Sequence, residues 1–453
     1  MGVSPLDYRY GREEVKKIFS EDMKLYYMLL VEKAIAQAES EKGLIPVEAY
    51  NEIAKAVDSG GVSLKRVKEI EAEISHDAMA VVKALTEKCE QGGKYVHFGV
   101  TSNDILDTST AMQLKEFYHI LLGDLFEIQE ALSGIITKHK RTAMLGRTHG
   151  QWASPITFGL KISVFLTEIN RHITRLLEAR KRILVGKILG PVGTGASIGE
   201  KALEVQERVM QILGIFPEDG ATQIVNRDRY VEYLSIINGI ATSLEKFGTE
   251  IRNLQRPEIA EVSEFFDPSR QVGSSAMPSK RNPISSENVC SLSRLIRSLI
   301  IPEYEAAVTW HERDLTNSAL ERFTIPYSSI LIDYTIRRMD SVFRNLYVNT
   351  ERMLENVNRD QTIMSESVVS ALTRNGVPRQ DAHELVRNAS MRSYEKNQAL
   401  QKSLIELGAM KLMDSTTLES ALEPSNFLGV SDRICDSVLG ATEKLRRDYE
   451  RDI

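Results

Sequence analysis

Cysteines and long apolar runs are scarce in this chain of 453 residues. The three cysteines, Cys89, Cys290 and Cys435, lie far apart and form neither a CxxC pair nor a disulfide framework, which favours a reducing compartment. We interpret them as buried structural thiols rather than catalytic groups. No segment is long and apolar enough to cross a membrane, and the first residues contain no apolar signal core. We therefore expect a cytoplasmic protein.

An excess of charge of one sign is also missing. Lys and Arg number 57 against 63 Asp and Glu, which gives a formal net charge of −6. A mildly acidic chain is a poor general binder of nucleic acid, because neutralising phosphates requires a surplus of cations. The hydrophobic fraction of 42% is enough for a sizeable core in a chain longer than one ordinary domain. We expect a folded protein with a small-molecule partner and no nucleic-acid or membrane partner.

Motifs for common cofactors are missing too. The chain has no HExxH, no CxxC and no other close spacing of His and Cys ligands, so we expect no bound metal. The run GTGASIG at 193–199 resembles a dinucleotide loop, but its last spacing is one residue too long and no βαβ pattern surrounds it. The run 273–277 is not a GxSxG nucleophile elbow, because Met277 holds the place of the final glycine. We expect an enzyme without a cofactor.

Proline is absent from several long stretches that are rich in helix formers. None occurs between Pro46 and Pro155, or between Pro326 and Pro378. Interior proline breaks helices, so these spans permit long ones. Apolar residues recur there at three- and four-residue steps. Long helices are expected over about 104–140, 154–184, 228–254 and 327–357.

The second of these helices has a start signal of its own. Ser154 is expected as its N-cap and Pro155 as its first residue. Each of the four helices exceeds the usual length of about 11–12 residues, and helices of that length pack side by side as a bundle. Strand signals are nearly absent, and the best candidate is the short run Ile188-Leu189.

These patterns predict an all-α protein with three segments. Residues 1–104 form an N-terminal domain of shorter helices, with breaks at 43–46 and 60–61. Residues 105–350 form the central long-helix bundle, which carries oligomerisation and the active site. Residues 351–453 form a C-terminal domain of shorter helices.

The break at 270–283 has the most unusual composition, RQVGSSAMPSKRNP. Pro283 is expected to open the next helix, so the serines of the loop and Lys280, Arg281 and Asn282 would converge on a helix N-terminus. Free N–H groups at such an end favour anions. The alternative is a mobile surface loop.

Four other breaks carry polar groups that suit a site. Thr101, Ser102 and Asn103 either contact a ligand or only cap the next helix. His149 lies between two glycines in GRTHGQ, which lets backbone approach a ligand, although a lone histidine is often structural. In Ser75-His76-Asp77 the carboxylate could raise the basicity of the histidine. The run WHERDLTNSALER at 310–322 either brings cationic and hydroxyl groups to one anion or begins a salt-bridged helix.

The run GSSAMPSKRNP at 273–283 resembles the signature loop of the fumarase/aspartase superfamily, GSSxMPxKxNP, at every fixed position. The resemblance covers the whole chain. HFGVTSNDILDT, GRTHGQ, GPVGTGA, TQIVNRDR and HERDLTNSALER occur in the order typical of the adenylosuccinate lyase branch. Thr-His-Gly-Gln instead of THLQ, the Lys-Arg-Asn form and the early pair Arg9-Tyr10 favour that branch over its relatives. Ser279 and Asn317 depart from its commonest forms, which leaves details of nucleotide binding open.

The resemblance implies a homotetrameric lyase with a central helix bundle and active sites shared between subunits. It implies the release of fumarate from adenylosuccinate, giving AMP, and from the succinyl-carboxamide ribotide of purine synthesis (SAICAR), giving AICAR. Ser274 would be the base and His149 the acid, and His76 would assist with Asp77 orienting it. Such an elimination needs a base, an acid and groups that stabilise the carbanion.

The resemblance also assigns the remaining site residues to substrate binding. Lys280, Asn282, Thr101, Ser102 and Ser275 would hold the succinyl carboxylates, with Arg281 and Ser75 beside them; Gln223 and Asn288 would hold the substrate between them; Arg9, Tyr10, Arg313, Ser318 and Arg322 would bind phosphate and ribose; and His97 is a further contact. The rival interpretations are another lyase of the superfamily and a non-catalytic helical scaffold. A scaffold explains the long helices but not the loop and the histidines together.

Overall fold

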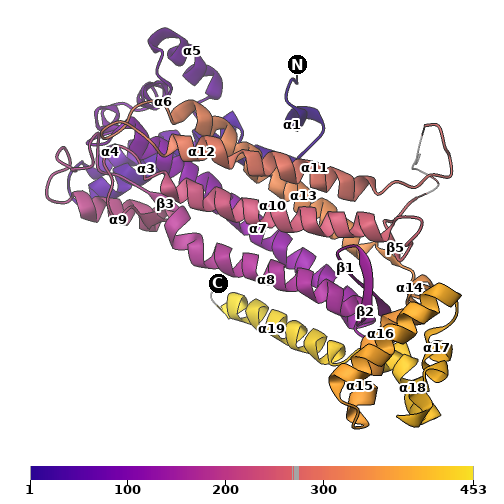
Figure 1. Cartoon of the computed structure of the whole chain (residues 1–453). Coiled ribbons are helices and arrows are strands. Elements are labelled where there is room, and N and C mark those ends of the chain that lie inside the picture. Colours follow the sequence, from indigo (N-terminus) through magenta and orange to yellow (C-terminus); the bar gives the residue numbers. More distant parts are fainter. Residues whose placement is uncertain (1, 268, 270–274, 452–453) are drawn as a thin grey trace. The chain divides into compact units, whose positions relative to one another are not determined.

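The computed structural model describes residues 2–267, 269 and 275–451, and helices dominate it (Figure 1). The chain divides into two compact units, each assembled from three stretches. Unit 1 comprises Met1–Leu125, His172–Thr242 and Ser291–Arg337, and unit 2 comprises Phe126–Arg171, Ser243–Cys290 and Arg338–Ile453. The expected all-α class is confirmed, whereas the division into three consecutive domains stays a prediction.

Five helices contribute residues to both units. They are α7 (Ser102–His139), α8 (Phe158–Ile183), α10 (Asp228–Leu254), α11 (Ile284–Ser298) and α13 (Ser318–Arg344). The predicted helices over 104–140 and 228–254 match α7 and α10 closely. The helix predicted over 327–357 is wrong at both ends, because α13 begins before Pro326 and ends at Arg344. The chain then forms β6 (Tyr347–Val348), which pairs with β5 (Val262–Ser263).

Unit 1 contains shorter elements besides its parts of the long helices. These are α1 (Pro5–Tyr8), α2 (Glu13–Ile18), α3 (Glu21–Glu41), α4 (Val47–Asp58), α5 (Leu64–Ile74), α6 (Asp77–Thr86), the 3-10 turn η1 (Gly92–Tyr95), β3 (Val185–Gly186), α9 (Ala202–Leu213), β4 (Phe216–Pro217) and α12 (Ile300–Ala306). The strand predicted at Ile188-Leu189 is wrong. The N–H of Ile188 donates to the Gln206 side chain and that of Leu189 to Asp104, so neither joins a ladder.

A half-buried cation links two of the long helices within unit 1. Arg12, at the start of α2, donates to Asp124 on α7 at 2.9 Å and to Asp333 on α13 at 3.0 Å. Both carboxylates are almost completely buried. Burial and the neighbouring Asp333 raise the pKa of Asp124 to about 8. A buried carboxylate pair is costly unless a cation compensates it, so Arg12 fixes the N-terminal segment against the bundle.

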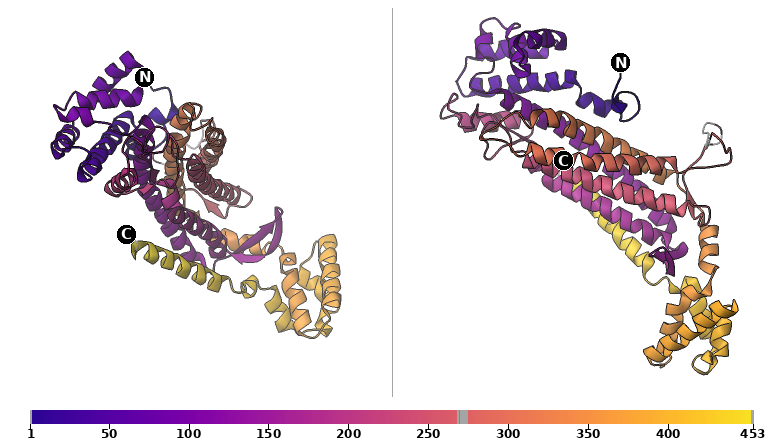
Figure 2. Two further views of the ribbon diagram at one scale, coloured as in Figure 1. Left: turned by 90° about the vertical axis from the view of Figure 1, so that its left-hand side faces the viewer. Right: turned by 45° about the horizontal axis from the view of Figure 1, so that its top comes forward.

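Unit 2 contains a β-hairpin and a cluster of short helices (Figure 2). Its elements are β1 (Ala143–Thr148), β2 (Gln151–Thr157), β5, β6, α14 (Thr350–Asn358), η2 (Gln361–Met364), α15 (Ser365–Arg374), α16 (Arg379–Lys396), α17 (Leu400–Glu406), η3 (Ala409–Lys411), α18 (Ser415–Leu422), η4 (Pro424–Phe427) and α19 (Ser431–Arg451). Val368, Leu372, Val386 and Leu404 belong to the apolar core of the cluster. In the unit's long helices, the rings of Phe165 and Phe247 stack at 4.2 Å.

The hairpin corrects the predicted start of the second long helix. Ser154 and Pro155 are not its first residues but lie in β2, where Pro155 pairs with Leu145. Proline is tolerated there because a two-stranded sheet consists only of edges. The helix α8 begins at Phe158, and the Thr157 hydroxyl accepts a hydrogen bond from the Leu160 N–H at 3.1 Å. A threonine therefore caps α8 where the sequence suggests a serine three residues earlier.

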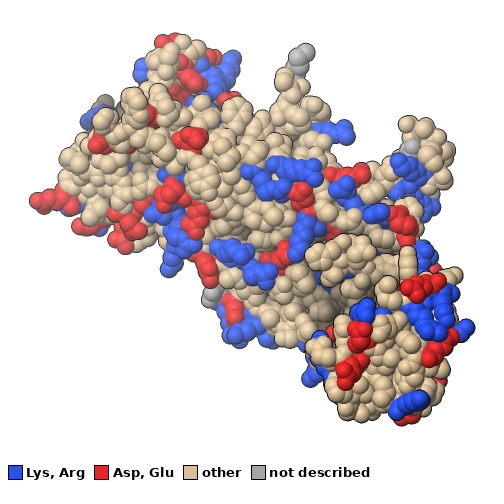
Figure 3. All heavy atoms as spheres, in the orientation of Figure 1, with Lys and Arg blue, Asp and Glu red and all other residues tan. Residues whose placement is uncertain are grey.

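Two further observations bear on partners. On the face shown in Figure 3, cationic and anionic side chains are interspersed rather than gathered by sign. Within the described part of the chain, no helix is long and apolar enough to span a membrane.

Candidate active site

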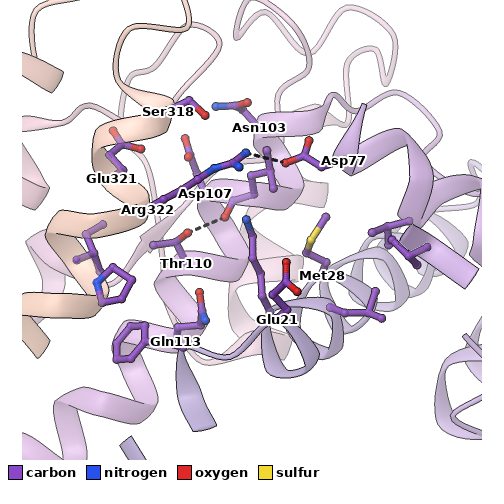
Figure 4. Close-up of a pocket in the computed structure, with 18 of the residues that line it drawn as sticks. Glu21, Met28, Asp77, Asn103, Asp107, Thr110, Gln113, Ser318, Glu321 and Arg322 are labelled. Atoms are coloured by element: carbon purple, nitrogen blue, oxygen red, sulfur yellow. Dashed lines mark hydrogen bonds and ion pairs between the residues drawn. The ribbon is translucent and has the colours of Figure 1, made fainter. Parts of the chain in front are cut away.

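A cleft of about 350 Å³ opens in unit 1 between side chains of α3, α5, α6, α7 and α13 (Figure 4). It brings together four of the predicted binding residues, Asp77, Arg313, Ser318 and Arg322. The Arg322 guanidinium donates to the Asp77 carboxylate at 3.3 Å. The cleft thus combines charged groups of both signs with a hydroxyl, which suits a polar, anionic ligand.

In the wall of the cleft, a buried arginine directly before α10 contacts two other long helices. Arg227 donates to Asp107 on α7 at 2.8 and 2.9 Å and to Glu321 on α13 at 2.7 Å. Asn317 is 1% exposed and donates from its amide to Glu321 at 2.9 Å. Asn317, one of the two departures from the family pattern, therefore belongs to this network. Asp107, Arg227 and Glu321 are not predicted as site residues, although HFGVTSNDILDT, TQIVNRDR and HERDLTNSALER contain them.

His76 lies beside the cleft as the N-cap of α6. Its Nδ1 accepts a hydrogen bond from the Met79 N–H at 3.3 Å. A neutral ring that accepts at Nδ1 carries its proton at Nε2. The Asp77 carboxylate lies 3.9 Å from that Nδ1 and also contacts Arg322, so the orientation of His76 by Asp77 stays a prediction. Ser75 adopts a left-handed conformation with φ 53°, which ends α5 and turns the chain into α6.

The segment before α7 is organised by a buried carboxylate. Asp104 accepts hydrogen bonds from the N–H groups of Thr101 at 2.9 Å and Gly190 at 2.8 Å, and it pairs with Lys187. Asp104 is the third residue of α7, and its side chain accepts the N–H of the N-cap residue Thr101. This contact is one of the two hydrogen bonds of a capping box. This geometry supports a capping role for the segment. It does not test whether Thr101 and Ser102 also bind substrate.

His97 is held by a carboxylate within unit 1. Its Nδ1 lies 2.7 Å from Oε1 of Glu32, which is 2% exposed. Burial alone would lower the pKa of His97, but the Glu32 carboxylate outweighs it and raises that pKa. His97 is therefore a fixed, readily protonated ring.

Gln223 follows Ala221 and Thr222, whose backbone lies close to that of Gly193. Gly193 has φ +79°, and a Cβ there would lie 2.0 Å from the Ala221 carbonyl oxygen. The GPVGTGA run thus needs glycine to let the segment approach. The Thr222 hydroxyl also donates to the Glu312 carbonyl at 3.0 Å. These contacts place the segment of Gln223 next to that of Arg313.

The pair Arg9-Tyr10 lies at the end of α1. The Arg9 guanidinium is 5.8 Å from the centroid of the Tyr10 ring, which packs edge-on against Tyr334 at 5.5 Å. Neither residue lines the cleft.

His149 lies at the tip of the hairpin in unit 2. Thr148 pairs with Gln151, so His149 and Gly150 form the two-residue turn, and their φ values are 54° and 73°. Two positive φ values are typical of a type I′ turn. The base of the hairpin is fixed by Arg147, which donates to the buried Glu261 at 2.7 and 2.9 Å. The histidine side chain is exposed.

The signature loop is described only in part. Ser274 lies outside the described residues, whereas Ser275, Lys280, Arg281 and Asn282 lie within them in unit 2. Lys280 closes a turn through its N–H to the Met277 carbonyl at 3.0 Å. The Arg281 guanidinium is 5.2 Å from the Phe266 ring centroid.

The helix after this loop corrects one expectation. Helix α11 begins directly after Pro283, but its first N–H groups are not free for an anionic ligand. The N–H groups of Ser285 and Ser286 donate to the Glu264 carboxylate at 3.1 and 2.7 Å. A residue of the chain therefore occupies the anion-binding position of this helix end. Farther along α11, the Asn288 amide oxygen is buried and has no hydrogen-bond partner among the described residues.

Three further results complete the site. Among the described residues, no three His, Cys, Asp or Glu side chains are placed to hold a metal ion. Cys290 and Cys435 are buried, and Cys89 is half-buried. Lys24 on α3 lines the cleft. No sequence motif identifies Lys24, because a lysine in an amphipathic helix gives no signal.

Comparison with known proteins identifies the class of enzyme that has this helical fold and charged cleft. The family model described as Lyase matches residues 7–297. A solved structure, the 3-carboxy-cis,cis-muconate lactonizing enzyme from Pseudomonas putida, superimposes with a TM-score of 0.88 at 28% identity, covering 98% of this chain and 100% of that chain. The chain therefore has the fold of the fumarase/aspartase lyases.

Closer relatives specify the branch. The adenylosuccinate lyase of Pyrococcus horikoshii is 46% identical over 99% of both chains. That of Methanocaldococcus jannaschii is 43% identical, covering 97% of this chain and 96% of the relative. A second family model, described as Adenylosuccinate lyase C-terminus, matches residues 361–438. The chain belongs to the adenylosuccinate lyase family, as the sequence motifs predict.

Proposed function

We propose that this enzyme eliminates fumarate from adenylosuccinate, giving AMP, and from SAICAR, giving AICAR. The cleft in unit 1 is the observation that carries the proposal. It places Arg313, Ser318 and Arg322 around one space, together with Asp77. Two guanidinium groups and a hydroxyl suit the phosphate of a nucleotide, since arginine binds phosphate in two-pronged geometry.

The two proton transfers are assigned to Ser274 and His149. Ser274 removes the Cβ proton of the succinyl group, and His149 protonates the nitrogen as the carbon–nitrogen bond breaks. Lys280 and Asn282 hold the succinyl carboxylates, helped by Ser275, Thr101 and Ser102, and stabilise the charge that develops next to the reacting carbon. His76 assists the acid through its exposed ring. Gln223 and Asn288 hold the substrate between them.

Because α11 has its first N–H groups bonded to Glu264, the alkoxide of Ser274 draws no support from those two donors. The support is assigned to the cation of Lys280 and to N–H groups of the loop itself. This account needs neither a metal nor an organic cofactor. Activity that survives exhaustive chelation and dialysis supports it, and activity that only a divalent ion restores contradicts it.

Assembly as a homotetramer in the cytoplasm, with sites shared between subunits, belongs to the same proposal. Large apolar side chains are exposed on and around α11 and α12, among them Leu295, Ile301, Tyr304 and Trp310. Exposed apolar groups of this kind are typical of subunit contacts. Light scattering tests the assembly, and a fully active monomer contradicts it.

The reaction is tested by ultraviolet absorbance of the purified enzyme with adenylosuccinate, argininosuccinate, aspartate and malate in turn. Only adenylosuccinate should be cleaved. The two neighbouring serines then provide a matched pair of variants. Ser274→Ala should nearly abolish turnover while substrate still binds, because it removes a group used in the transition state. Ser275→Ala should mainly weaken binding. A dead Ser275→Ala beside an active Ser274→Ala contradicts the assignment of the base.

A further inference from the structure

The cleft in unit 1 is lined by equal numbers of carboxylates and cations, but not every cation contacts a carboxylate. The lining includes five carboxylates and five cations, which are Glu21, Glu71, Asp77, Asp107 and Glu321 on one side and Lys24, Lys68, Arg227, Arg313 and Arg322 on the other. Lys68 pairs with Glu21 and Glu71 at 2.8 and 3.2 Å. Arg227 pairs with Asp107 and Glu321, and Arg322 pairs with Asp77. All five carboxylates are thus paired.

Two cations remain without a carboxylate. Among the described residues, Lys24 and Arg313 have no ion pair within 4.0 Å, and the Nε of Arg313 is buried without a hydrogen-bond partner. A cation withdrawn from water without a partner is costly, and an anionic ligand would relieve that cost. The cleft therefore holds two cations that have no carboxylate in direct contact.

Lys24 is the less expected of the two. It belongs to the first turns of α3, and its side chain lines the cleft with Asp77 and Arg322. Burial lowers the pKa of Lys24, Asp77 opposes that effect, and the cation of Arg322 adds to it. Lys24 is thus influenced by the charges of both Asp77 and Arg322, but it forms an ion pair with no carboxylate among the described residues.

We propose that Lys24 is a phosphate-binding residue of this enzyme, acting with Arg313, Ser318 and Arg322 on the 5′-phosphate of the nucleotide. The inference rests on the proposed function and adds a residue to it. Two unpaired cations and a hydroxyl match a dianionic phosphate better than a single carboxylate. The succinyl carboxylates are assigned to Lys280 and Asn282, which leaves the phosphate as the anion for this cleft.

The test compares Lys24→Met with Lys33→Met in the full-length enzyme. Both lysines lie on α3, but Lys33 pairs with Asp58 at 2.6 Å and does not line the cleft. The KM for adenylosuccinate should rise roughly 10- to 100-fold in Lys24→Met, the worth of a hydrogen bond to a charged group. The kcat should change little, because the phosphate takes no part in bond breaking and is bound alike in ground and transition states. Lys33→Met should leave both parameters near wild type.

Inorganic phosphate provides a second measurement that a structural role would not change. Phosphate should inhibit the wild type competitively, and its inhibition constant should rise in Lys24→Met and be restored in Lys24→Arg. Lys24→Gln serves if the Met variant does not fold. An unchanged KM and phosphate inhibition constant in the variant, or a fall in kcat alone, would overturn the role of Lys24. A wild type that does not cleave adenylosuccinate would instead refute the proposed function.

Discussion

The predicted binding residues in unit 1 and the predicted acid in unit 2 are positioned in different ways. In unit 1, Asp77, Arg313, Ser318 and Arg322 line a cleft whose wall contains a buried network centred on Arg227. In unit 2, His149 belongs to a two-residue turn, and Arg147, two residues before it, is bonded to Glu261. Side-chain contacts therefore organise the cleft, whereas backbone conformation places the histidine.

This difference suits the two tasks. Groups that bind a constant part of the substrate gain from being fixed in advance, because less order is lost on binding. A general acid must instead approach a reacting nitrogen, and its geometry often tightens only when substrate is present. We infer that variants in the cleft change KM and that variants at the hairpin change kcat. The predictions below test that division, from the largest expected effect to the smallest.

His149→Gln should give the largest effect. Glutamine keeps much of the size and some hydrogen bonding of histidine but cannot deliver a proton. Turnover should fall by roughly 10²- to 10⁴-fold, the usual worth of general acid–base catalysis. Single-turnover kinetics measure the fall, and an unchanged circular dichroism spectrum controls for folding. Near-normal turnover would move the acid elsewhere, with His76 as the first alternative.

A smaller effect, on stability, is expected at Glu39 in unit 1. This residue is fully buried on α3, and neither carboxylate oxygen has a hydrogen-bond partner among the described residues. Burial, helped by the charge of Glu32, raises the pKa of Glu39 from 4.5 to about 8. Between these values the folded state holds a proton that the unfolded state has lost. Stability from this group is therefore present below pH 4.5 and is lost as pH rises towards 8, at about 1.4 kcal/mol per pH unit.

Glu39→Gln should remove that dependence, because the amide stays neutral. The free energy of unfolding should rise by about 1–3 kcal/mol at pH 8 relative to wild type and change little at pH 4.5. Denaturant titrations at the two pH values measure both differences. Equal effects at the two pH values would show that the carboxyl is not protonated in the folded protein. The kcat should not change, since Glu39 does not line the cleft.

The sequence predicts the long helices well because proline spacing and apolar periodicity report on local structure. It fails at the hairpin, since Ser154-Pro155 is also a good helix start, and only pairing with Leu145 across the turn decides for a strand. It fails likewise at Pro326, which α13 contains although proline usually marks a boundary. In both places the observed structure overrides the local preference of proline for a helix start or a helix boundary.

The site shows the same limit. Motifs identify Asp77, Arg313, Ser318 and Arg322, and the structure brings them together. Motifs do not show that Glu264 bonds to the start of α11, because that contact joins segments about twenty residues apart. Nor do they identify Lys24, whose position matters only because every carboxylate around it is already paired. The pairing of these charges depends on contacts between distant segments, which the sequence does not contain.

The smallest effect is expected at Gly150, beside His149 in the turn. Its φ is +73°, and a Cβ there would meet no atom within 4 Å, so Gly150→Ala adds backbone strain without a clash. That strain is about 1–2 kcal/mol for a residue other than glycine. Because the turn alone places His149, kcat should fall by less than about tenfold, while KM, set by the cleft, stays unchanged. Gly43→Ala is the matched control, since Gly43 has φ +69° and equally open surroundings but lies in unit 1 after α3. It should cost similar stability in denaturant titration and leave kcat intact. If both variants lose turnover equally, or if Gly150→Ala raises KM instead, then backbone conformation does not position the acid as the comparison of the two units requires.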